Sequence, residues 1–363
     1  MKIAFDSQIF TMQEYGGVSR YICSLAAHLA NIQGVEARIV APLYINNYLE
    51  KLPKSMVSGI RMPHIPKAGR ILHKSNIFFA RRAIAKFAPQ IVHETYFMEN
   101  SVAPKGVRTV VTVYDMIHER FPAAFPQQDK TSHQKRIATQ RADHVICISE
   151  STRKDLLEFF DLPEEKVSVV YLGFDSLSPM ISETTQNKPY VLYVGQRGGY
   201  KNFDGFLRAY ASSLWLRNNF DVLCFGGGAF SNAEKKLFND LNLLDKQLLQ
   251  INGDDSKLAG IYHGAALFVY PSLYEGFGIP PLEAMSLACP VACSNNSSIP
   301  EVVGDAGEYF DPGNIDSMRV ALESVLNSAA RRSELIDSGL VRCTEFSWTQ
   351  CARQTLAIYQ GLL

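Results

Sequence analysis

The sequence predicts an α/β protein built from two doubly wound modules in tandem, each with a parallel sheet covered by helices on both faces. Short apolar runs alternate with amphipathic helical segments along almost the whole chain, as expected for buried parallel strands with crossover helices. The series stops once, at residues 173–188, where Ser, Thr, Pro and Asn collect, and then begins again. A length of 363 residues also suits two hydrophobic cores better than one.

The first module, residues 1–172, begins with a strand that leads into a glycine-containing loop at residues 15–21. A helix with one apolar face runs from this loop to about Ala30. Towards the end of the module, Ser149 can cap a helix over residues 150–160. The predicted strands are 2–5, 37–41, 90–93, 108–114, 143–149 and 167–171.

The second module, residues 189–345, repeats the alternation after the linker at residues 173–188. Its predicted strands are 190–195, 221–225, 247–251, 267–270, 290–293 and 307–310. A final segment, residues 346–363, reads as a helix that starts at a cap-like Ser347.

Charge is unevenly distributed between the two halves of the chain. Residues 1–172 hold 22 Lys and Arg against 16 Asp and Glu, whereas residues 173–363 hold 14 against 20. Opposite net charges fit two domains that face each other across a cleft, with the basic domain free to meet an anionic partner.

The composition also bears on the cellular compartment. No apolar stretch approaches the length of a membrane-spanning helix, and the amino end is already strand-like, so neither a signal peptide nor a spanning segment is expected. Seven cysteines without a Cys-x-x-Cys pair indicate free thiols in a reducing compartment. We therefore expect a cytoplasmic protein.

Two glutamates frame a glycine-rich turn after the predicted strand at residues 267–270. Glu275 lies in the turn, and Glu283 lies in what should be the first turn of a helix opened by Pro280 and Pro281. Backbone amides in such a turn suit phosphate, and carboxylates among them suit hydroxyl groups. The combination indicates a ligand with both phosphate and polyol, although an ordinary strand-to-helix turn would look the same.

Two cations follow the first strand of the second module, within a loop that opens at Gly195. Arg197 offers a planar fork of donors and Lys201 a point charge, so together they make a plausible clamp for a diphosphate. The alternative is a solvated turn with Asn202 as a helix cap.

Other glycines give weaker signals. The run at residues 226–231 resembles a dinucleotide fingerprint, but Ser231 stands in place of its third glycine, which argues against nicotinamide binding. These glycines more plausibly line the same nucleotide site. In the first module, Gly17 and its neighbour Gly16 could bring amides to a phosphate or could simply permit a tight turn.

A group of titratable residues follows the predicted strand at residues 108–114. Asp115, His118 and Glu119 lie at its carboxyl end, next to Tyr114, where His118 could exchange protons or bind a hydroxyl. A lone histidine is more often structural.

Motifs for metals and for ATP are missing. The chain has no Asp-x-Asp triplet, no His-x-x-x-His pair and no P-loop sequence, so we expect no metal, no cofactor and no P-loop kinase activity. The segment 67–87 instead interleaves basic and apolar residues. Such a surface can lie on an anionic membrane, or it can be a helix packed on its own sheet with a charged outer face.

Taken together, these stretches resemble the retaining family-four glycosyltransferases of the GT-B fold over almost the whole chain. The most specific part is the spacing of Glu275 and Glu283 in the run from Tyr270 to Met285, joined by Arg197 and Lys201. Residues 16–18, 299–307 and 346–348 also resemble the family.

The resemblance implies two tandem Rossmann-like domains facing a central cleft, with the C-terminal helix crossing back onto the N-terminal domain. It implies that Arg197 and Lys201 hold the donor diphosphate, and that Glu283 binds the ribose hydroxyls. Glu275 would bind donor-sugar hydroxyls with the amides of Gly276, Phe277 and Gly278. Gly253, Asp254 and Leu258 would flank the base, and Gly17 would complete the phosphate site.

One departure from the family concerns acid–base chemistry. Many relatives carry a histidine where this chain has Tyr114, directly before Asp115. Either His118 takes that role or the hydroxyl of Tyr114 binds the sugar. A retaining transfer from the front face would need no dedicated protein base, because the departing phosphate accepts the proton of the acceptor.

The resemblance implies a metal-independent hexosyltransferase of surface-polysaccharide assembly, with a GDP-linked sugar favoured as donor and a lipid-linked glycan as acceptor. We expect no nucleic-acid partner. The enzymatic alternative is a nucleotide-sugar epimerase, which would isomerise its substrate without an acceptor. A non-catalytic nucleotide- or glycan-binding protein is a second alternative, but intact Lys201, Glu275 and Glu283 weigh against it.

Overall fold

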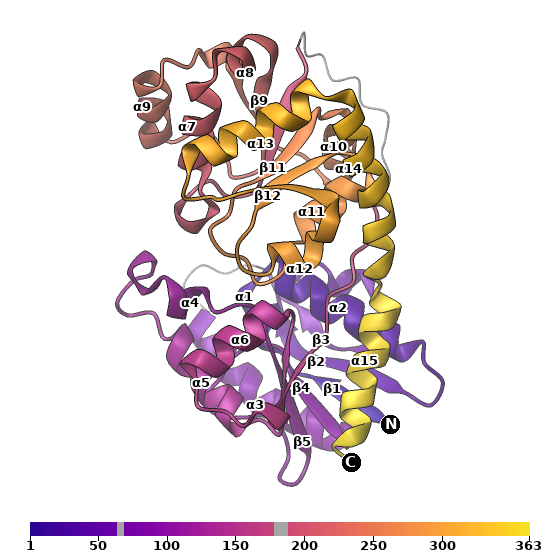
Figure 1. Ribbon diagram of the computed structural model, residues 1–363. Helices are drawn as coiled ribbons and strands as arrows, with labels where there is room; N and C mark the ends of the chain where they lie inside the picture. The colour runs from indigo at the N-terminus through magenta and orange to yellow at the C-terminus, as the bar shows by residue number, and fades with distance from the viewer. Residues whose placement is uncertain (64–68, 178–187) are drawn as a thin grey trace. The chain divides into compact units, whose positions relative to one another are not determined.

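The structure is a computed structural model that describes residues 1–63, 69–177 and 188–363, apart from the side chains of residues 69–75 and 245. The chain forms two compact units. Unit 1 comprises Met1–Gly173 and Ser347–Leu363, and unit 2 comprises Phe174–Phe346. Both termini therefore belong to unit 1 (Figure 1).

Unit 1 is built on a parallel seven-stranded sheet in the order β3-β2-β1-β4-β5-β6-β7. Its strands are β1 (Lys2–Phe5), β2 (Glu36–Tyr44), β3 (Val57–Arg61), β4 (Ile91–Glu94), β5 (Arg108–Val113), β6 (His144–Cys147) and β7 (Val167–Val169). Its helices are α1 (Gln8–Met12), α2 (Gly17–Ala30), α3 (Gly69–Phe87), α4 (Ile117–Arg120), α5 (Thr131–Arg141), α6 (Glu150–Phe159) and α15 (Trp348–Gly361). Helices cover both faces of the sheet (Figure 1).

Unit 2 repeats this plan with a parallel six-stranded sheet in the order β10-β9-β8-β11-β12-β13. Its strands are β8 (Tyr190–Val194), β9 (Asp221–Phe225), β10 (Leu248–Ile251), β11 (Leu267–Tyr270), β12 (Val291–Ser294) and β13 (Gly307–Phe310). Its helices are α7 (Phe203–Ser212), α8 (Leu214–Asn219), α9 (Asn232–Asp240), α10 (Asp255–Gly264), α11 (Ile279–Ser286), α12 (Ile299–Val303), α13 (Ile315–Asn327) and α14 (Ala329–Arg342).

Each unit has its own apolar core. In unit 2, side chains of α7 such as Phe203 and Phe206 pack against β8 and α13. In unit 1, Ile84 and Phe87 of α3 pack on β1, β2 and β4. The central strands are buried on both faces, which explains why they read as continuous apolar runs in the sequence. The predicted fold class, two doubly wound α/β modules in tandem, is confirmed.

Three local details differ from the sequence expectations. The edge strand β3 was not predicted, because its side chains are mostly exposed and show no apolar run. The short helix α1 lies within the predicted loop after β1. Helix α11 begins at Ile279, so Glu283 lies just beyond the first turn and not within it.

The C-terminal helix α15 belongs to unit 1, where it packs against α2 (Figure 1). Ser347 caps it by accepting a hydrogen bond from the amide of Gln350. The hydroxyl of Tyr359 is hydrogen-bonded to Nδ1 of His93 on β4, and Nε2 of His93 is 2.8 Å from Oγ1 of Thr112. Burial lowers the pKa of His93 to about 3, so this imidazole is neutral at physiological pH.

Two further expectations concern the compartment and the basic segment. All seven cysteines are buried free thiols. Within the described ranges, no helix is both long and apolar enough to cross a bilayer. Of the basic segment 67–87, Lys67 and the side chains of Arg70, His73 and Lys74 lie outside the described part of the structure.

Candidate functional site

The candidate site of unit 2 lies where the strand order of its sheet reverses, between β8 and β11. In open parallel sheets this position opens a crevice at the carboxyl ends of the strands, where ligands bind. The loops after the two strands are joined by hydrogen bonds from the Leu273 amide to the Tyr200 carbonyl (2.7 Å) and from Nδ2 of Asn202 to the Pro271 carbonyl (3.1 Å). The sheet therefore holds the two predicted site loops against each other.

Lys201 and Glu275 meet at this edge. Nζ of Lys201 is 2.7 Å from Oε1 of Glu275, and the two side chains are 24% and 11% exposed. The pair is therefore accessible without being fully solvated, so its charges are screened less than those of a surface pair. An ammonium and a carboxylate side by side can receive a phosphate and a sugar hydroxyl, respectively.

The loop that carries Glu275 is fixed by two serines after β12. The Glu275 amide donates to Oγ of Ser297 (2.9 Å), and Oγ of Ser298 donates to the carbonyls of Glu275 (2.9 Å) and Phe277 (2.7 Å). The Phe277 ring is buried against Phe346, so only its backbone could serve a ligand. The sequence analysis did not find these serines, although their place directly after a predicted strand was an available signal.

Glu283 is mostly buried on α11, and its Oε2 lies 3.5 Å from the hydroxyl of Tyr262. Gly278 caps this helix with a φ of +117°, a conformation that glycine adopts at no steric cost. Burial, followed by the nearby Glu283 carboxylate, raises the pKa of Tyr262, which keeps its hydroxyl protonated. Glu275 thus lies on the connection from β11 to α11, and Glu283 lies on α11 itself.

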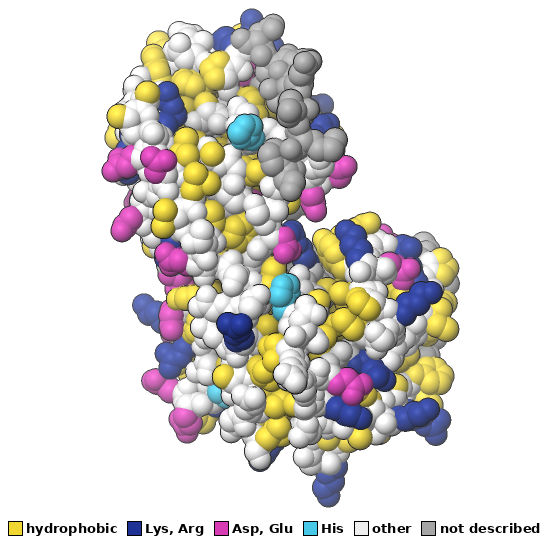
Figure 2. Space-filling view, turned by 90° about the vertical axis from the view of Figure 1, so that its right-hand side faces the viewer, with side chains coloured by type: hydrophobic (Ala, Val, Ile, Leu, Met, Phe, Trp, Pro, Cys, Tyr) yellow, Lys and Arg dark blue, Asp and Glu magenta, His cyan; other side chains and the backbone are white. Residues whose placement is uncertain are grey.

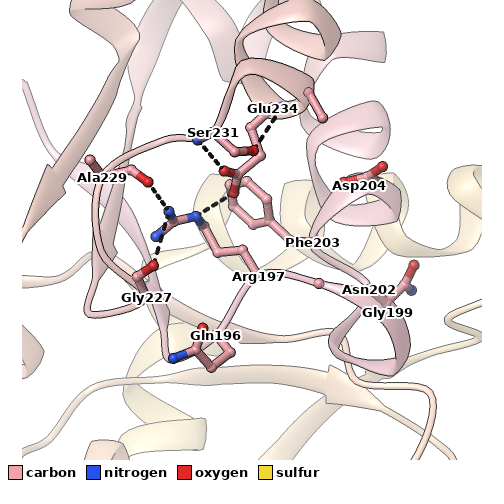
Figure 3. Close-up of a pocket in the computed structure, with 12 residues that line it drawn as sticks. Gln196, Arg197, Gly199, Asn202, Phe203, Asp204, Gly227, Ala229, Ser231 and Glu234 are labelled. Carbon is pink, nitrogen blue, oxygen red and sulfur yellow. Dashed lines mark hydrogen bonds and ion pairs between the residues drawn. The ribbon is translucent and has the colours of Figure 1, made fainter. Parts of the chain in front are cut away.

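Arg197 is placed differently from Lys201. Its guanidinium turns into the loop after β9, where Nε is 2.5 Å from Oε1 of Glu234 and Nη1 is 2.9 Å from the Gly226 carbonyl. The side chain is 4% exposed. Figure 3 shows it directed toward Glu234 and the carbonyls of Gly227 and Ala229. In this position the guanidinium is hydrogen-bonded to protein groups of the loop after β9 and of α9.

A cavity of about 570 Å³ lies beside Arg197. Its walls come from the loop after β8, the start of α7, the loop after β9 and the start of α9, and they include Gln196, Asp204 and Ser231 (Figure 3). Gly195 leaves β8 with a φ of +113° and donates its amide to the Phe225 carbonyl, which ties the loops after β8 and β9 together.

Gly253, Asp254 and Leu258 lie where β10 leads into α10. Asp254 caps α10 by accepting a hydrogen bond from the Lys257 amide (2.9 Å). A side chain at position 253 would collide with that of Lys257, so glycine is required for this close approach. Leu258 is mostly buried on α10. These residues share the carboxyl edge of the sheet with Gly195 and Glu275.

In unit 1 the strand order reverses between β1 and β4. Gly17 is the first residue of α2, and the ideal Cβ position on it meets no atom within 4 Å, so the approach to this helix end is open. Asp6, directly after β1, is fully buried and accepts hydrogen bonds from the amide and Oγ1 of Thr95, directly after β4. The sequence analysis missed Asp6, which looked like an ordinary turn residue.

Tyr114 and His118 both have protein partners. The Tyr114 hydroxyl donates to the Thr95 carbonyl (3.1 Å), and burial raises its pKa well above the ordinary value. The His118 ring stacks on Phe125, and its Nε2 is 3.8 Å from a carboxylate oxygen of Asp129. Nδ1 of His118 is buried without a hydrogen-bond partner within the described residues.

A buried cation supports this loop. Lys135 on α5 is 1% exposed, and its Nζ donates to the Asp115 carbonyl (2.9 Å) and to Oε2 of Glu119 (2.8 Å). Asp115 in turn accepts the Ile117 amide at Oδ1. Nothing in the sequence distinguishes Lys135 from a solvated cation, because α5 reads as a polar helix throughout.

Groups of three or more His, Cys, Asp or Glu side chains that could hold a metal ion do not occur among the described residues. What the described geometry offers is a pair of opposite charges, backbone amides and buried hydroxyl groups at the carboxyl edge of each sheet. Groups of this kind suit phosphates and polyols.

Comparison with known families extends these observations to nearly the whole chain. Residues 15–176 match the family model of Glycosyltransferase Family 4, and residues 179–340 match that of Glycosyl transferases group 1. The first match lies almost entirely in unit 1, and the second lies in unit 2.

Individual relatives agree. The chain is 28% identical over 318 residues to the O-antigen chain mannosyltransferase B of Escherichia coli, covering 83% of this chain and 81% of that protein. The sucrose-phosphate synthase of Thermosynechococcus elongatus has a similar fold, with a TM-score of 0.79 at 20% identity, covering 100% of this chain and 99% of the other. HepE of Anabaena, solved with UDP and glucose, reaches a TM-score of 0.75 at 16% identity over 99% of both chains. With both units matched, the chain belongs to the family-four glycosyltransferases of the GT-B fold.

Proposed function

We propose that this enzyme transfers a hexose, mannose or a related deoxyhexose, from a nucleotide-diphosphate sugar to a glycan acceptor during O-antigen assembly. The observation that carries the proposal is the Lys201–Glu275 pair at the switch point of the unit 2 sheet. The similarity to an O-antigen chain mannosyltransferase supports the sugar and the setting. We favour a GDP-linked donor, although the complex of HepE shows that a protein of this fold also binds UDP.

Different residues of unit 2 bind different parts of the donor. Lys201 neutralises the diphosphate as the sugar departs, while Glu275 and the amides of Gly276, Phe277 and Gly278 bind the sugar hydroxyls. Glu283 takes the ribose hydroxyls. The base lies near Gly253, Asp254 and Leu258, at the start of α10. Gly195 lets the backbone approach the phosphates closely.

Unit 1 supplies the remaining groups. The open N-terminus of α2 at Gly17 offers backbone amides to a phosphate. His118 binds a hydroxyl through its unpartnered Nδ1, and Asp115 and Tyr114 shape the surrounding loop.

The transfer retains the anomeric configuration. The bond between C1 of the sugar and the phosphate oxygen breaks, and its electrons pass to the nucleotide diphosphate, which Lys201 stabilises. The acceptor hydroxyl forms the new bond to C1 from the same face, and its proton passes to the diphosphate. The charge on Lys201 serves in place of a metal ion, so EDTA should leave the rate unchanged, and NMR of the product should show the donor's anomeric configuration.

Lys201→Ala should lower transfer at least tenfold, since removing one preorganised donor to a developing anion typically costs about a hundredfold. Glu275→Gln should also lower it, because the carboxylate loses one acceptor oxygen for the sugar. Initial rates with saturating donor measure both effects. Lys236→Ala, an exposed lysine on α9, is the matched control.

A thermal-shift screen with GDP, UDP and dTDP tests donor binding separately. A bound diphosphate raises the melting temperature of the wild-type protein by mass action. Wild-type rates in Lys201→Ala, or no shift with any nucleotide diphosphate, would contradict the proposal.

We further propose that unit 1 touches an anionic membrane, where a lipid-linked acceptor would be found. Residues 51–93 contain nine Lys and Arg and no Asp or Glu. Phe78, Phe79 and Ile60 are 53%, 50% and 69% exposed, and Ile60 and Phe79 line a mainly apolar groove of about 560 Å³ with Arg82 and Lys86 at its side. Figure 2 shows hydrophobic and basic side chains interspersed over the surface of this unit.

Sedimentation with lipid vesicles tests this contact. The protein should bind vesicles that contain phosphatidylglycerol, and it should leave them as salt rises, because each basic residue near the surface contributes about 1 kcal/mol. The double variant Phe78→Ser/Phe79→Ser should weaken binding, whereas Leu214→Ser, at an exposed leucine of unit 2, should not. Equal binding to neutral phosphatidylcholine vesicles would count against the proposal.

A further inference from the structure

The guanidinium of Arg197 is hydrogen-bonded to one carboxylate and to several backbone carbonyls of the same loop. Nη2 lies 2.9 Å from the Gly228 carbonyl and 3.2 Å from that of Ala229, in addition to the bonds of Nε with Glu234 and of Nη1 with Gly226. The ring of Phe230 packs against the guanidinium at 4.8 Å. The planar fork of arginine thus gathers the carbonyls of one loop around a single point (Figure 3).

The loop that Arg197 holds has an unusual backbone. Gly226, Gly227 and Gly228 all have positive φ, at +79°, +71° and +74°. A Cβ on Gly227 would lie 2.6 Å from Nη1 of Arg197 and 2.8 Å from the Gly195 carbonyl, so the loop packs directly on both. Three glycines in succession have little intrinsic preference for one conformation, which means that an external group must fix it.

Glu234 connects this arrangement to α9. Its Oε2 accepts the Ser231 amide (2.7 Å), while the Glu234 amide donates to Oγ of Ser231, which together form a capping box. Burial alone would raise the pKa of the Glu234 carboxyl, but Arg197 and Ser231 hold it below its ordinary value. One carboxylate thereby joins the guanidinium to the start of the helix.

We propose that Arg197 is a positioning residue that fixes residues 226–229 and acts on the donor only through this loop. The inference has two parts. That Arg197 orders the loop stands by itself, whereas the effect of this order on the donor (the donor half of the inference) rests on the proposed function. With the carbonyls of residues 226–229 turned toward Arg197, the amides of Gly227, Gly228 and Ala229 have no protein partner within the described residues, and Gly227 lies against the Gly195 carbonyl. Fixed backbone amides of this kind can serve an anion.

A direct contact between Arg197 and phosphate would have a high cost. The side chain would have to leave Glu234 and several carbonyls at once, and Glu234 would stay behind, 15% exposed, without its charge partner. Lys201 faces no such obstacle, since it is 24% exposed and, among the described residues, its close ion pair is with Glu275 alone. Of the two cations predicted as a clamp, only Lys201 is therefore assigned to the phosphate.

The first experiment measures loop order without any ligand. Hydrogen exchange of the full chain should speed up at least tenfold at the amides of Gly226 and Glu234 in Arg197→Met. The Gly226 amide donates to the Ile251 carbonyl at the start of the loop, and the Glu234 amide donates to Oγ of Ser231 at its end, so both bonds depend on the order of the loop. Glu234→Gln, which keeps the shape of the side chain, should show a smaller increase, and Lys201→Ala should show none. Unchanged exchange in Arg197→Met would overturn the inference.

The second experiment separates positioning from direct contact. It uses the nucleotide pair of the base that binds the wild type, GDP with GMP or UDP with UMP, and compares their dissociation constants. A direct contact predicts that Arg197→Lys keeps most of the preference for the diphosphate. Positioning predicts that Arg197→Lys binds the diphosphate as poorly as Arg197→Met, at least tenfold weaker than wild type. Both variants should also lose the preference for the diphosphate, because the loop amides that serve the phosphates are no longer fixed.

A double variant provides the rescue test. Arg197→Met combined with Glu234→Leu removes both charges and should regain at least threefold of the affinity lost in Arg197→Met, because no unpaired carboxylate remains in the loop. Absence of rescue, together with a diphosphate preference that Arg197→Lys keeps, would overturn the positioning role. If the wild type binds no nucleotide, the proposed function and the donor half of the inference both fail, whereas hydrogen exchange still decides whether Arg197 orders the loop.

Discussion

Asp6 is a carboxyl group without exposed surface at the carboxyl end of β1. It accepts hydrogen bonds from the amide and Nε2 of Gln8 and from the amide and Oγ1 of Thr95. Burial, followed by the nearby Glu94 carboxylate, raises the pKa of Asp6 to about 6. The folded protein therefore keeps a proton on Asp6 between pH 3.8 and about 6, where the unfolded chain releases it.

This residue should make the stability of unit 1 depend on pH. Because the folded pKa is raised, Asp6 contributes stability at low pH that is lost as pH rises through about 6. In Asp6→Asn this contribution is absent, and Nδ2 can donate to Oε1 of Gln8, which is buried without a partner. The stability of the wild type relative to the variant should therefore fall between pH 4 and 7, as measured by urea unfolding.

The exposed carboxylate of Asp161 provides the control for this measurement. Asp161→Asn should track the wild type across the same pH range. A difference between wild type and Asp6→Asn that stays constant with pH would show that the carboxyl group does not titrate in this window.

At the scale of residues, some features of the site could be predicted from the sequence and others could not. Lys201 and Glu275 follow two apolar runs that end at the same edge of a parallel sheet, so their meeting could be inferred from the pattern alone. The direction of Arg197 could not, because it depends on Glu234 and on three glycines whose conformation has no signature in the sequence. Lys135 escaped notice because its burial arises from packing against the loop that carries Glu119.

At the scale of elements, the loop between β9 and α9 has three successive residues with positive φ, Gly226, Gly227 and Gly228. Gly227 and Gly228 have nearly the same φ, yet a side chain on Gly227 would strike Arg197 and Gly195, whereas one on Gly228 would meet nothing within 4 Å. The two positions therefore separate the cost of the backbone conformation from the cost of crowding.

Alanine substitutions at the two glycines should differ in stability. Gly228→Ala should cost about 1–2 kcal/mol, the penalty of a left-handed conformation for a residue with a Cβ. Gly227→Ala should cost roughly 1–3 kcal/mol more because it also overpacks the loop against the guanidinium. Urea unfolding measures both losses, and equal losses would show that the loop does not pack on Arg197.

The helices and strands differ in how well the sequence predicted them. Strands of the sheet interiors were predicted within a few residues, because burial on both faces makes them continuous apolar runs. The edge strand β3 was missed, since the exposed face of an edge carries no such signal, and Gly59 lies against the Ala41 carbonyl where no side chain fits. Helix α15 was predicted from its Ser347 cap, which the structure confirms.

At the scale of the whole molecule, unit 1 is assembled from two separate stretches of chain, and unit 2 is the segment between them. The two stretches meet closely, because a Cβ on Gly173 would lie 2.2 Å from the Trp348 amide nitrogen. Helix α15 buries Trp348, Leu356 and Tyr359 in unit 1. The unit is therefore incomplete without the last residues of the chain.

A spliced protein tests this division. Joining Gly173 to Ser347 through a short Gly-Ser linker, without residues 174–346, should give a chain that unfolds cooperatively, with Trp348 as its one tryptophan reporter. Residues 1–173 alone should lack a cooperative transition, because the partner surface of α15 on α2 would be uncovered. A spliced chain without cooperative unfolding would show that unit 1 depends on unit 2.

The division of unit 1 also sets an order for folding during synthesis. A ribosome adds roughly 5–20 residues per second, so the 173 residues of unit 2 separate the first stretch of unit 1 from α15 by roughly ten to thirty seconds. During this interval His93 lacks its hydrogen-bond partner Tyr359, and the surface of α2 that packs against α15 stays uncovered. Unit 2 can complete its sheet while the nascent chain is still attached, whereas unit 1, begun first, is finished last.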